Sequence, residues 1–303
     1  MATALRRGAR ERALKPAEFA YIRAGSLDAA FDALQSAGGE AKLLAGGQSL
    51  MPALNMRLSE PRLLIDINAI PGLDAIVPLD GGLRIGALAR QAALGRSPEV
   101  ARLAPLIGQA IPHIAHPAIR NRGTLGGSLA QADPAAELPA CAVALGASLH
   151  LASRRGTRIV AAADFFRGLY ETALAPDEIL TAIDTPAPAP GTRSAFLEFA
   201  RRRGDYAIAG IAATARVDRG AATALRLVFF GIDDKPVEAR EAAAALLGGN
   251  LSERLTAAEE ALAGDIDPSG DLQANAATKA HLARVLLRRA VTALAAAPHA
   301  EAA

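Results

Sequence analysis

The chain has 303 residues, of which 51% are hydrophobic and 21% charged, and its length suits two globular domains. Its net charge of +2 gives no electrostatic reason to expect nucleic acid as a partner. The single cysteine, Cys141, excludes an internal disulfide and an iron–sulfur cluster held by this chain alone. It favours a reducing, cytoplasmic compartment, and its apolar surroundings predict a buried thiol. The longest uncharged run, residues 138–152, is too short to cross a bilayer, so no transmembrane segment is expected.

The first half of the chain mixes predicted strands and helices. Residues 1–14 lack apolar periodicity and are expected to form a disordered tail. Short apolar runs predict strands at residues 19–23, 41–44, 63–67, 83–85, 149–152, 158–162 and 178–184. Apolar residues at helical spacing predict helices at residues 27–37, 50–57, 90–109 with a break at Pro98, and 137–145. The strands at 149–152 and 158–162 are expected to pair as a hairpin.

A proline-rich segment divides the chain. Residues 185–190 read Thr-Pro-Ala-Pro-Ala-Pro, which predicts a stiff, extended connector and therefore a domain boundary. Beyond it, strands are predicted at residues 195–202, 211–217 and 225–232, and helices at 237–247, 252–262 and 275–296. Strands followed by helices indicate a three-stranded antiparallel sheet with helices over one face, and hence an α+β chain. Residues 298–303 are expected to form a second tail.

The segment Ile119–Pro139 carries the densest set of ligand-binding signals. It contains Gly123, Thr124, Gly126, Gly127 and Ser128 in close succession, followed by acidic residues at 133 and 137. Glycines allow a ligand to approach the main chain closely, and successive N–H groups can form an anion-binding concavity. The hydroxyl groups can donate to phosphate oxygens. The segment is therefore either a nucleotide-binding loop or a structural loop of small residues.

A second glycine motif lies about eighty residues earlier. Residues 45–49, Ala-Gly-Gly-Gln-Ser, follow a predicted strand and precede a short predicted helix, whose N-terminus favours a phosphate. Two such motifs suit a diphosphate bound from two sides. No G-x-G-x-x-G motif follows a predicted strand and no G-K-[ST] occurs, so a Rossmann crevice and a P-loop are not expected. A dinucleotide outside the Rossmann pattern points to a flavin.

The motifs match a known family. Residues 44–52, Leu-Ala-Gly-Gly-Gln-Ser-Leu-Met-Pro, resemble the first flavin motif of the FAD-binding medium subunits of molybdenum hydroxylases. Residues 119–139 resemble the second motif, and residues 201–209, Arg-Arg-Arg-Gly-Asp-Tyr-Ala-Ile-Ala, are similar to the C-terminal domain signature. The likeness covers about residues 15–295. The family includes carbon monoxide dehydrogenase and bacterial relatives of xanthine dehydrogenase.

The resemblance implies a fold and a set of site residues. A PCMH-type (vanillyl-alcohol-oxidase-like) FAD-binding domain would span residues 15–187, in subdomains of about 15–68 and 69–187, with a C-terminal α/β domain at 191–297. The diphosphate of FAD would lie between the two motifs, Glu137 would contact the adenosine part, and Leu180 and Tyr206 would flank the isoalloxazine ring. The residues implied to bind FAD are Ala45, Gly46, Gly47, Gln48, Ser49, Thr124, Leu125, Gly126, Gly127, Ser128, Glu137, Leu180 and Tyr206. Glu137 and Ser128 depart from the family, which usually has Asp and often has Asn at these positions.

The resemblance also implies a function. The chain would be the FAD-carrying, electron-transfer subunit of a carbon monoxide, aldehyde, xanthine or N-heterocycle dehydrogenase. It would take electrons from a [2Fe–2S] small subunit, next to a large subunit that holds the molybdopterin, in a dimer of heterotrimers. No catalytic acid, base or metal ligand is expected in this chain. A self-sufficient flavin oxidoreductase and a non-enzymatic assembly subunit remain as alternatives, and the substrate and the final acceptor (NAD, quinone or oxygen) stay open.

Several other residues allow two interpretations. His113 and His116 could be a metal pair, but isolated loop histidines explain them without a third ligand. Asp133 and Glu137 could form an acid–base pair, but a ribose contact and a charge at a helix start explain them as well. Tyr206 could be a core aromatic residue instead of a neighbour of the flavin.

Overall fold

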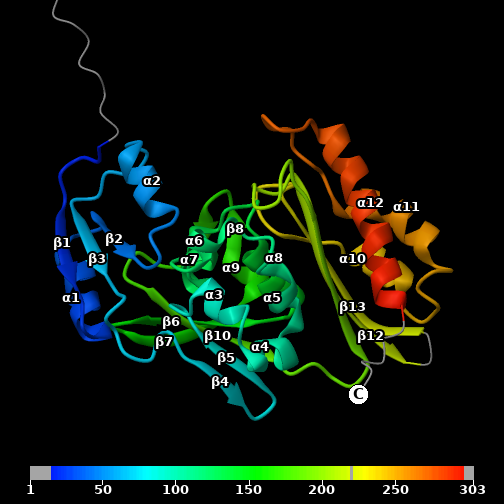
Figure 1. Cartoon of the computed structure of the whole chain (residues 1–303), viewed down its shortest axis with the longest axis horizontal. Helices are drawn as coiled ribbons and strands as arrows, with labels where there is room; N and C mark the ends of the chain where they lie inside the picture. The colour runs from blue at the N-terminus through cyan, green and yellow to red at the C-terminus, as the bar shows by residue number, and fades with distance from the viewer. Residues whose placement is uncertain (1–14, 219–220, 297–303) are drawn as a thin grey trace, which may run out of the picture.

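The structure, a computed structural model, describes residues 15–218 and 221–296, so both predicted tails lie outside the described residues. Figure 1 shows three parts along the long axis of the molecule. A small N-terminal sheet lies at one end, a larger sheet with short helices lies in the middle, and a third sheet backed by helices lies at the other end. The candidate site lies where the first two parts meet.

The N-terminal part is a three-stranded parallel sheet in the order β1-β3-β2. Its elements are β1 (Ala20–Arg23), α1 (Leu27–Ser36), β2 (Ala41–Leu44), α2 (Leu50–Asn55) and β3 (Leu63–Asp66). The Ser26 side chain accepts from the N–H of Ala29 and so begins α1. Phe31 on α1 packs into one core with Ile65 on β3. The strands and helices predicted for this part are confirmed.

The central part is a five-stranded antiparallel sheet in the order β4-β5-β10-β6-β7. Its strands are β4 (Ile76–Leu79), β5 (Gly82–Gly86), β6 (Ser148–Ser153), β7 (Gly156–Ala161) and β10 (Ile179–Pro186). The predicted β6–β7 hairpin is confirmed, whereas β4 was not predicted because Pro78 interrupts its pattern; Pro is tolerated there because β4 is an edge strand. The predicted connector is wrong at its start: Thr185 and Pro186 belong to β10, where Pro186 pairs with Gly82.

Short helices cover this sheet. They are α3 (Gln91–Leu94), α4 (Pro98–Leu103), α5 (Pro105–Ala110), α6 (Pro117–Arg120), α7 (Leu125–Gln131), α8 (Glu137–Ala144) and α9 (Ala162–Phe165), followed by the small pair β8 (Phe166–Gly168) and β9 (Glu171–Thr172). The region 90–109 holds three helices instead of the two predicted, because Pro105 as well as Pro98 begins a helix. Helix α8 is confirmed and completely buried, and Cys141 within it is buried as predicted.

The C-terminal part is an antiparallel sheet of four strands, where three were predicted. They are β11 (Thr192–Phe199), β12 (Ala209–Asp218), β13 (Ala221–Phe230) and β14 (Val237–Glu238), followed by α10 (Arg240–Leu246), α11 (Leu255–Asp265) and α12 (Ala276–Ala295). The sequence predicts a helix that includes residues 237 and 238. They pair with Phe229 and Val228 instead, since the turn at Gly231 returns the chain beside β13, and two residues are too short for a periodic signal.

Both faces of this sheet are buried. Ile211 and Ala213 face the helices, which cover one face as predicted, while Ala212 between them joins the core of the central part. The central part covers the second face, and the sequence did not predict this contact. There the Thr214 hydroxyl and the Arg226 guanidinium donate to the last carbonyls of α8, at 3.2 and 3.1 Å. None of the helices in residues 15–218 and 221–296 has the length and hydropathy needed to span a bilayer.

Candidate dinucleotide-binding site

The first glycine motif presents a row of free backbone donors. Residues 45–49 connect the end of β2 to α2, and Gly47 adopts the left-handed region with φ of 73°. Within the described residues, no carbonyl or side chain accepts from the N–H groups of Gly46, Gly47, Gln48 or Ser49. The Ser49 side chain does not cap α2. These N–H groups, the Ser49 hydroxyl and the start of a helix together suit a phosphate group.

Two residues that the sequence did not single out position this loop. The Asn68 side-chain amide donates to the carbonyls of Ala45 and Leu44, at 2.9 and 3.2 Å. Its oxygen accepts from the Arg90 guanidinium at 2.7 Å, and Arg90 also donates to the carbonyl of Arg122 at the second motif. Asn68 and Arg90 therefore connect the two glycine motifs. The only sequence signal was an asparagine directly after a predicted strand.

The second glycine motif is used largely for packing. Thr124 begins α7, and its hydroxyl accepts from the N–H of Gly127 at 3.1 Å. The N–H groups of Leu125 and Gly126 donate to carbonyls of the segment 87–89, at 3.0 and 2.8 Å. A Cβ atom on Gly126 would lie 2.4 Å from that of Ala87. The N–H of Ser128 donates to the carbonyl of Thr124 at 3.2 Å, so four of the donors expected to meet a ligand are occupied by the protein itself.

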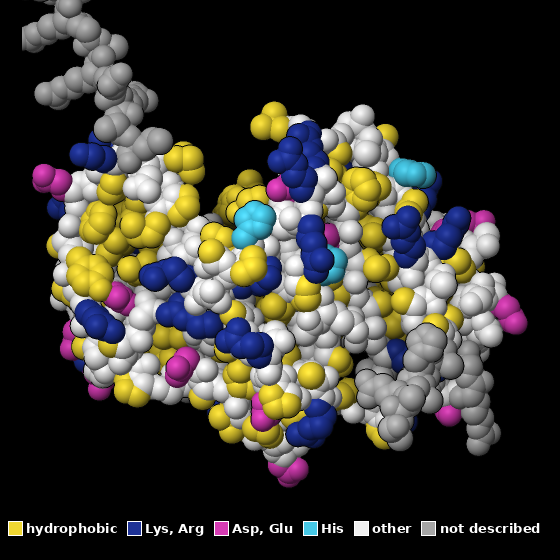
Figure 2. Space-filling view, in the orientation of Figure 1, with side chains coloured by type: hydrophobic (Ala, Val, Ile, Leu, Met, Phe, Trp, Pro, Cys, Tyr) yellow, Lys and Arg dark blue, Asp and Glu magenta, His cyan; other side chains and the backbone are white. Residues whose placement is uncertain are grey.

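The structure brings the two motifs into direct contact. A Cβ atom on Gly46 would lie 2.4 Å from the carbonyl oxygen of Arg122 and 2.9 Å from Cα of Gly123. A pocket of about 360 Å³ opens beside this contact, lined from both sides by residues that include Gly47, Gln48, Asn68, Ile119 and Arg122. Figure 2 shows the surface notched between the N-terminal part and the central part of the molecule. Only glycine at position 46 permits this approach.

Glu137 and Tyr206 lie together in a second region of the site. Glu137 is 7% exposed, and burial raises the pKa of its carboxyl to about 8, with further contributions from the charges of Glu198 and Asp133. Tyr206 is 60% exposed, so it is not a core aromatic residue. Partial burial and then the charges of Asp133 and Glu137 raise the pKa of Tyr206. Asp133, Glu137 and Tyr206 are therefore neighbours.

Tyr170 also belongs to this region and was missed by the sequence analysis. It occupies the turn between β8 and β9 in the left-handed region, with φ of 56°, which is strained for a tyrosine. Its hydroxyl donates to Asp133 at 3.4 Å. A lone tyrosine in an unpredicted two-residue turn carries no sequence signal for this position.

Leu180 differs from the other predicted residues because it is 5% exposed and belongs to the core of the central part. It lies on β10 next to Thr181, whose carbonyl accepts from the N–H of Ala87 below the second motif. Leu180 thus lies on the strand that is hydrogen-bonded to Ala87, the residue on which Gly126 packs.

The two histidines have different surroundings. His113 lies beside the C-terminal sheet, with Nδ1 3.6 Å from the carboxylate of Glu198 and its ring 5.1 Å from that of Phe196. His116 precedes α6. No group of three or more possible metal ligands occurs among the residues that the structure describes.

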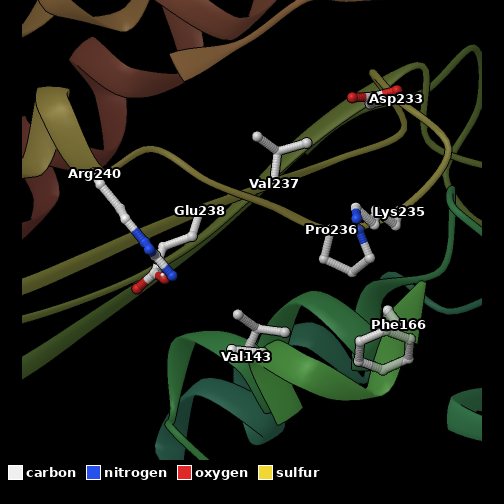
Figure 3. A pocket seen from close by; sticks show the side chains of 9 residues that line it. Val143, Phe166, Asp233, Lys235, Pro236, Val237, Glu238 and Arg240 are labelled. Carbon is white, nitrogen blue, oxygen red and sulfur yellow. Dashed lines mark hydrogen bonds and ion pairs between the residues drawn. The ribbon is translucent and has the colours of Figure 1, made fainter. Parts of the chain in front are cut away.

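A second cavity, of about 390 Å³, lies away from all these residues. It is formed between α8–β8 and the segment around β14, with Val143 and Phe166 on one side and Pro236 and Val237 on the other (Figure 3). Both acidic and basic side chains line it, and none of the predicted site residues does. Lys235 and its neighbours lie in the turn between β13 and β14.

Comparison with known proteins identifies the two parts of the chain. The family described as "FAD binding domain in molybdopterin dehydrogenase" matches residues 17–188, and "CO dehydrogenase flavoprotein C-terminal domain" matches residues 194–294. The chain belongs to this flavoprotein family. The resemblance seen in the glycine motifs is thereby confirmed, and so is the predicted combination of an FAD-binding domain with a C-terminal domain.

Relatives of this flavoprotein match over nearly their whole length. The alpha subunit of the 6-hydroxypseudooxynicotine dehydrogenase complex of Paenarthrobacter nicotinovorans is 38% identical, over 91% of this chain and 94% of the relative. The carbon monoxide dehydrogenase medium chain of Afipia carboxidovorans is 37% identical, over 91% of this chain and 96% of the relative. A solved carbon monoxide dehydrogenase of Hydrogenophaga pseudoflava superposes with a TM-score of 0.90 at 37% identity, covering 92% of this chain and 98% of that one. The solved structure of quinoline 2-oxidoreductase of Pseudomonas putida superposes with a TM-score of 0.87 at 34% identity, covering 93% of this chain and 98% of that one.

The residues present fit the FAD that this family binds. Four free N–H groups and the Ser49 hydroxyl face no protein acceptor in the described part of the chain, which is what a diphosphate requires. Any side chain larger than that of glycine at position 46 would collide with the second motif. The chain is an FAD-binding medium subunit of the molybdenum hydroxylase family.

Proposed function

We propose that this chain is the electron-transfer subunit of a molybdenum-containing dehydrogenase. It accepts electrons from a [2Fe–2S] subunit and passes them to an external acceptor. The observation that carries the proposal is the match, over almost the whole chain, to medium chains of such enzymes, together with free backbone donors at the first glycine motif. The single cysteine supports a separate iron–sulfur subunit, because this chain cannot hold an iron–sulfur cluster by cysteines of its own.

The residues of this chain bind and orient the cofactor. Residues 45–49 and 124–128 hold the diphosphate of FAD, with most of the free N–H donors supplied by the first motif. Glu137, Leu180 and Tyr206 contact the remainder of the molecule. The bound FAD supplies the redox chemistry, and the protein supplies binding, orientation and electrostatics. No side chain of this chain is assigned as a catalytic acid or base.

The proposed assembly follows from the names of the relatives, several of which are subunits of a complex. The partners are an iron–sulfur small subunit and a molybdopterin-containing large subunit, in a cytoplasmic dimer of heterotrimers. The FAD-binding domain spans residues 15–187, in subdomains of about 15–68 and 69–187, and the C-terminal domain spans residues 191–297. The organic substrate binds in the large subunit.

Purification from the native host tests the proposal. The tagged chain is expected to co-purify with two further subunits that carry iron and molybdenum, and the chain alone to show a flavin spectrum. Rapid reduction of its flavin by the reduced iron–sulfur subunit would support the electron transfer. A colourless chain that takes up no added FAD would refute it. Turnover of an organic reductant by the isolated chain would instead favour a self-sufficient flavin oxidoreductase.

A further inference from the structure

The first glycine motif is fixed within the N-terminal part of the molecule. The Asn68 side-chain amide, just beyond β3, donates to the carbonyls of Leu44 and Ala45. Asp66, the last residue of β3, orients this amide by accepting from the backbone N–H of Asn68 at 2.8 Å and from its side chain at 2.6 Å. The other Asp66 oxygen accepts from the Tyr21 hydroxyl on β1 at 2.6 Å. Strands β1 and β3 therefore determine where Asn68 and the start of the first motif lie.

The second glycine motif is fixed within the central part. Main-chain hydrogen bonds join it to the segment 87–91, in which the N–H of Gln91 donates to the carbonyl of Gly123 at 2.9 Å. Arg90 extends from the same segment, and its guanidinium donates to the carbonyl of Arg122. Arg90 is therefore part of the unit that carries the second motif.

One side-chain hydrogen bond joins the two units at the site. Arg90 Nη2 donates to Asn68 Oδ1 at 2.7 Å. Within the described residues, the only other side-chain hydrogen bonds between the N-terminal part and the central part are those of Arg154 with Asp28 and Asp32. Arg154 lies in the β6–β7 turn and its two partners lie on α1, and none of these three residues lines the pocket. The two connections between the parts are thus at different places.

The contact between the two motifs lies between the groups that Asn68 and Arg90 hold. Asn68 binds the carbonyl of Ala45, directly before Gly46. Arg90 binds the carbonyl of Arg122, whose oxygen would lie 2.4 Å from a Cβ atom on Gly46. The hydrogen bond between Asn68 and Arg90 therefore spans the closest approach of the two motifs, where a small displacement would separate them.

Asparagine and arginine are suited to this connection. A side-chain amide supplies two N–H donors and a carbonyl acceptor, so Asn68 can hold the first motif and accept from Arg90 at the same time. The planar guanidinium of Arg90 has several donors in a fixed geometry and reaches Asn68 and the Arg122 carbonyl together. Both side chains are partly buried, so water competes less for the hydrogen bond between them.

We propose that the hydrogen bond between Asn68 and Arg90 preassembles the FAD site, because it holds the N-terminal part against the central part before the cofactor binds. Asn68 and Arg90 are positioning residues, which act through the carbonyls of Ala45 and Arg122. Without this bond the two motifs separate in a fraction of the molecules, and FAD binds only the molecules in which they meet. This inference rests on the proposed function, in which FAD is the ligand of the two motifs.

The experiment measures FAD binding to the full chain, stripped of flavin, by flavin fluorescence at equilibrium and by stopped flow. Asn68→Ala and Arg90→Met are each expected to raise the dissociation constant about tenfold, the effect of losing one hydrogen bond to a charged group. The bond acts before FAD binds, so the association rate constant is expected to fall by the same factor while the dissociation rate constant stays unchanged. The double variant is expected to lose no more than the weaker-binding single variant, because both changes remove the same connection.

Arg154→Met is the matched control. It removes the other side-chain connection between the same two parts, away from the pocket, and is expected to bind FAD at the wild-type rate. Arg90→Lys keeps the charge but loses the fork of donors, so its association rate constant is expected to lie between those of the wild type and Arg90→Met. Should Asn68→Ala fail to fold, Asn68→Asp replaces it, since a carboxylate of the same size cannot donate to the two carbonyls.

Three results would overturn the inference. They are a change confined to the dissociation rate constant, an Asn68 variant that binds FAD as Arg154→Met does, and losses that add fully in the double variant. Urea unfolding of the flavin-free variants supplies a further readout, because a general loss of stability would lower the urea midpoint and FAD affinity together in Arg154→Met as well. A wild-type chain that takes up no FAD would instead refute the proposed function.

Discussion

Gly46 lies where the structure has no room for a methyl group. A Cβ atom there would lie 2.4 Å from the Arg122 carbonyl oxygen and 2.9 Å from Cα of Gly123. Ordinary van der Waals contact requires about 3.5 Å, so Gly46→Ala must separate the two glycine motifs by about 1 Å. Overpacking of this kind costs about 1–3 kcal/mol. This cost destabilises the arrangement of the two motifs that binds FAD, so FAD affinity is expected to drop by about 10- to 100-fold.

The assay pairs FAD binding, measured by flavin fluorescence, with urea unfolding of the flavin-free chain. Gly25→Ala is the control, because no atom lies within 4 Å of the Cβ position at Gly25 and the same methyl group is added. The control is expected to bind FAD as the wild type does. If Gly46→Ala binds FAD as tightly as Gly25→Ala, the contact between the motifs does not form the site, and the reasoning is refuted.

Two further predictions concern stability. Lys279 is buried and donates to the carbonyl of Gly231 at 2.8 Å, so Lys279→Met is expected to lower the free energy of unfolding by about 1–3 kcal/mol. The control Lys42→Met, at an exposed position of β2, is expected to leave it unchanged, and equal urea midpoints for the two variants would contradict this prediction. The hydrogen bond from Arg84 lowers the pKa of Asp184. The pair therefore stabilises the fold fully above the ordinary carboxyl pKa, and this stability is lost as the pH falls below that value and through the lowered pKa of the folded state. Asp184→Asn is expected to destabilise the chain by up to about 1 kcal/mol at pH 7 and less at pH 3, and an equal loss at both values would refute the assignment.

Elements with several residues of clear pattern could be predicted from the sequence, and short ones could not. Helix α8 and the β6–β7 hairpin have uninterrupted apolar patterns and were found where predicted. Strand β14 has two residues, and its strand conformation comes from pairing with β13. The break at Pro105 was missed because a proline can begin a helix as well as end one.

The sequence alone determined the ligand class and the family, because glycines, hydroxyl residues and their spacing are local properties. It predicted a dinucleotide site at residues 45–49 and 119–139 without any knowledge of the fold. Only the tertiary structure decided which donors are free: residues 46–49 keep theirs, whereas Leu125 and Gly126 donate to the segment 87–89. It also decided that Glu137, at the start of α8, is buried. The reason is physical, since hydrogen-bond partners and burial depend on segments that are distant along the chain.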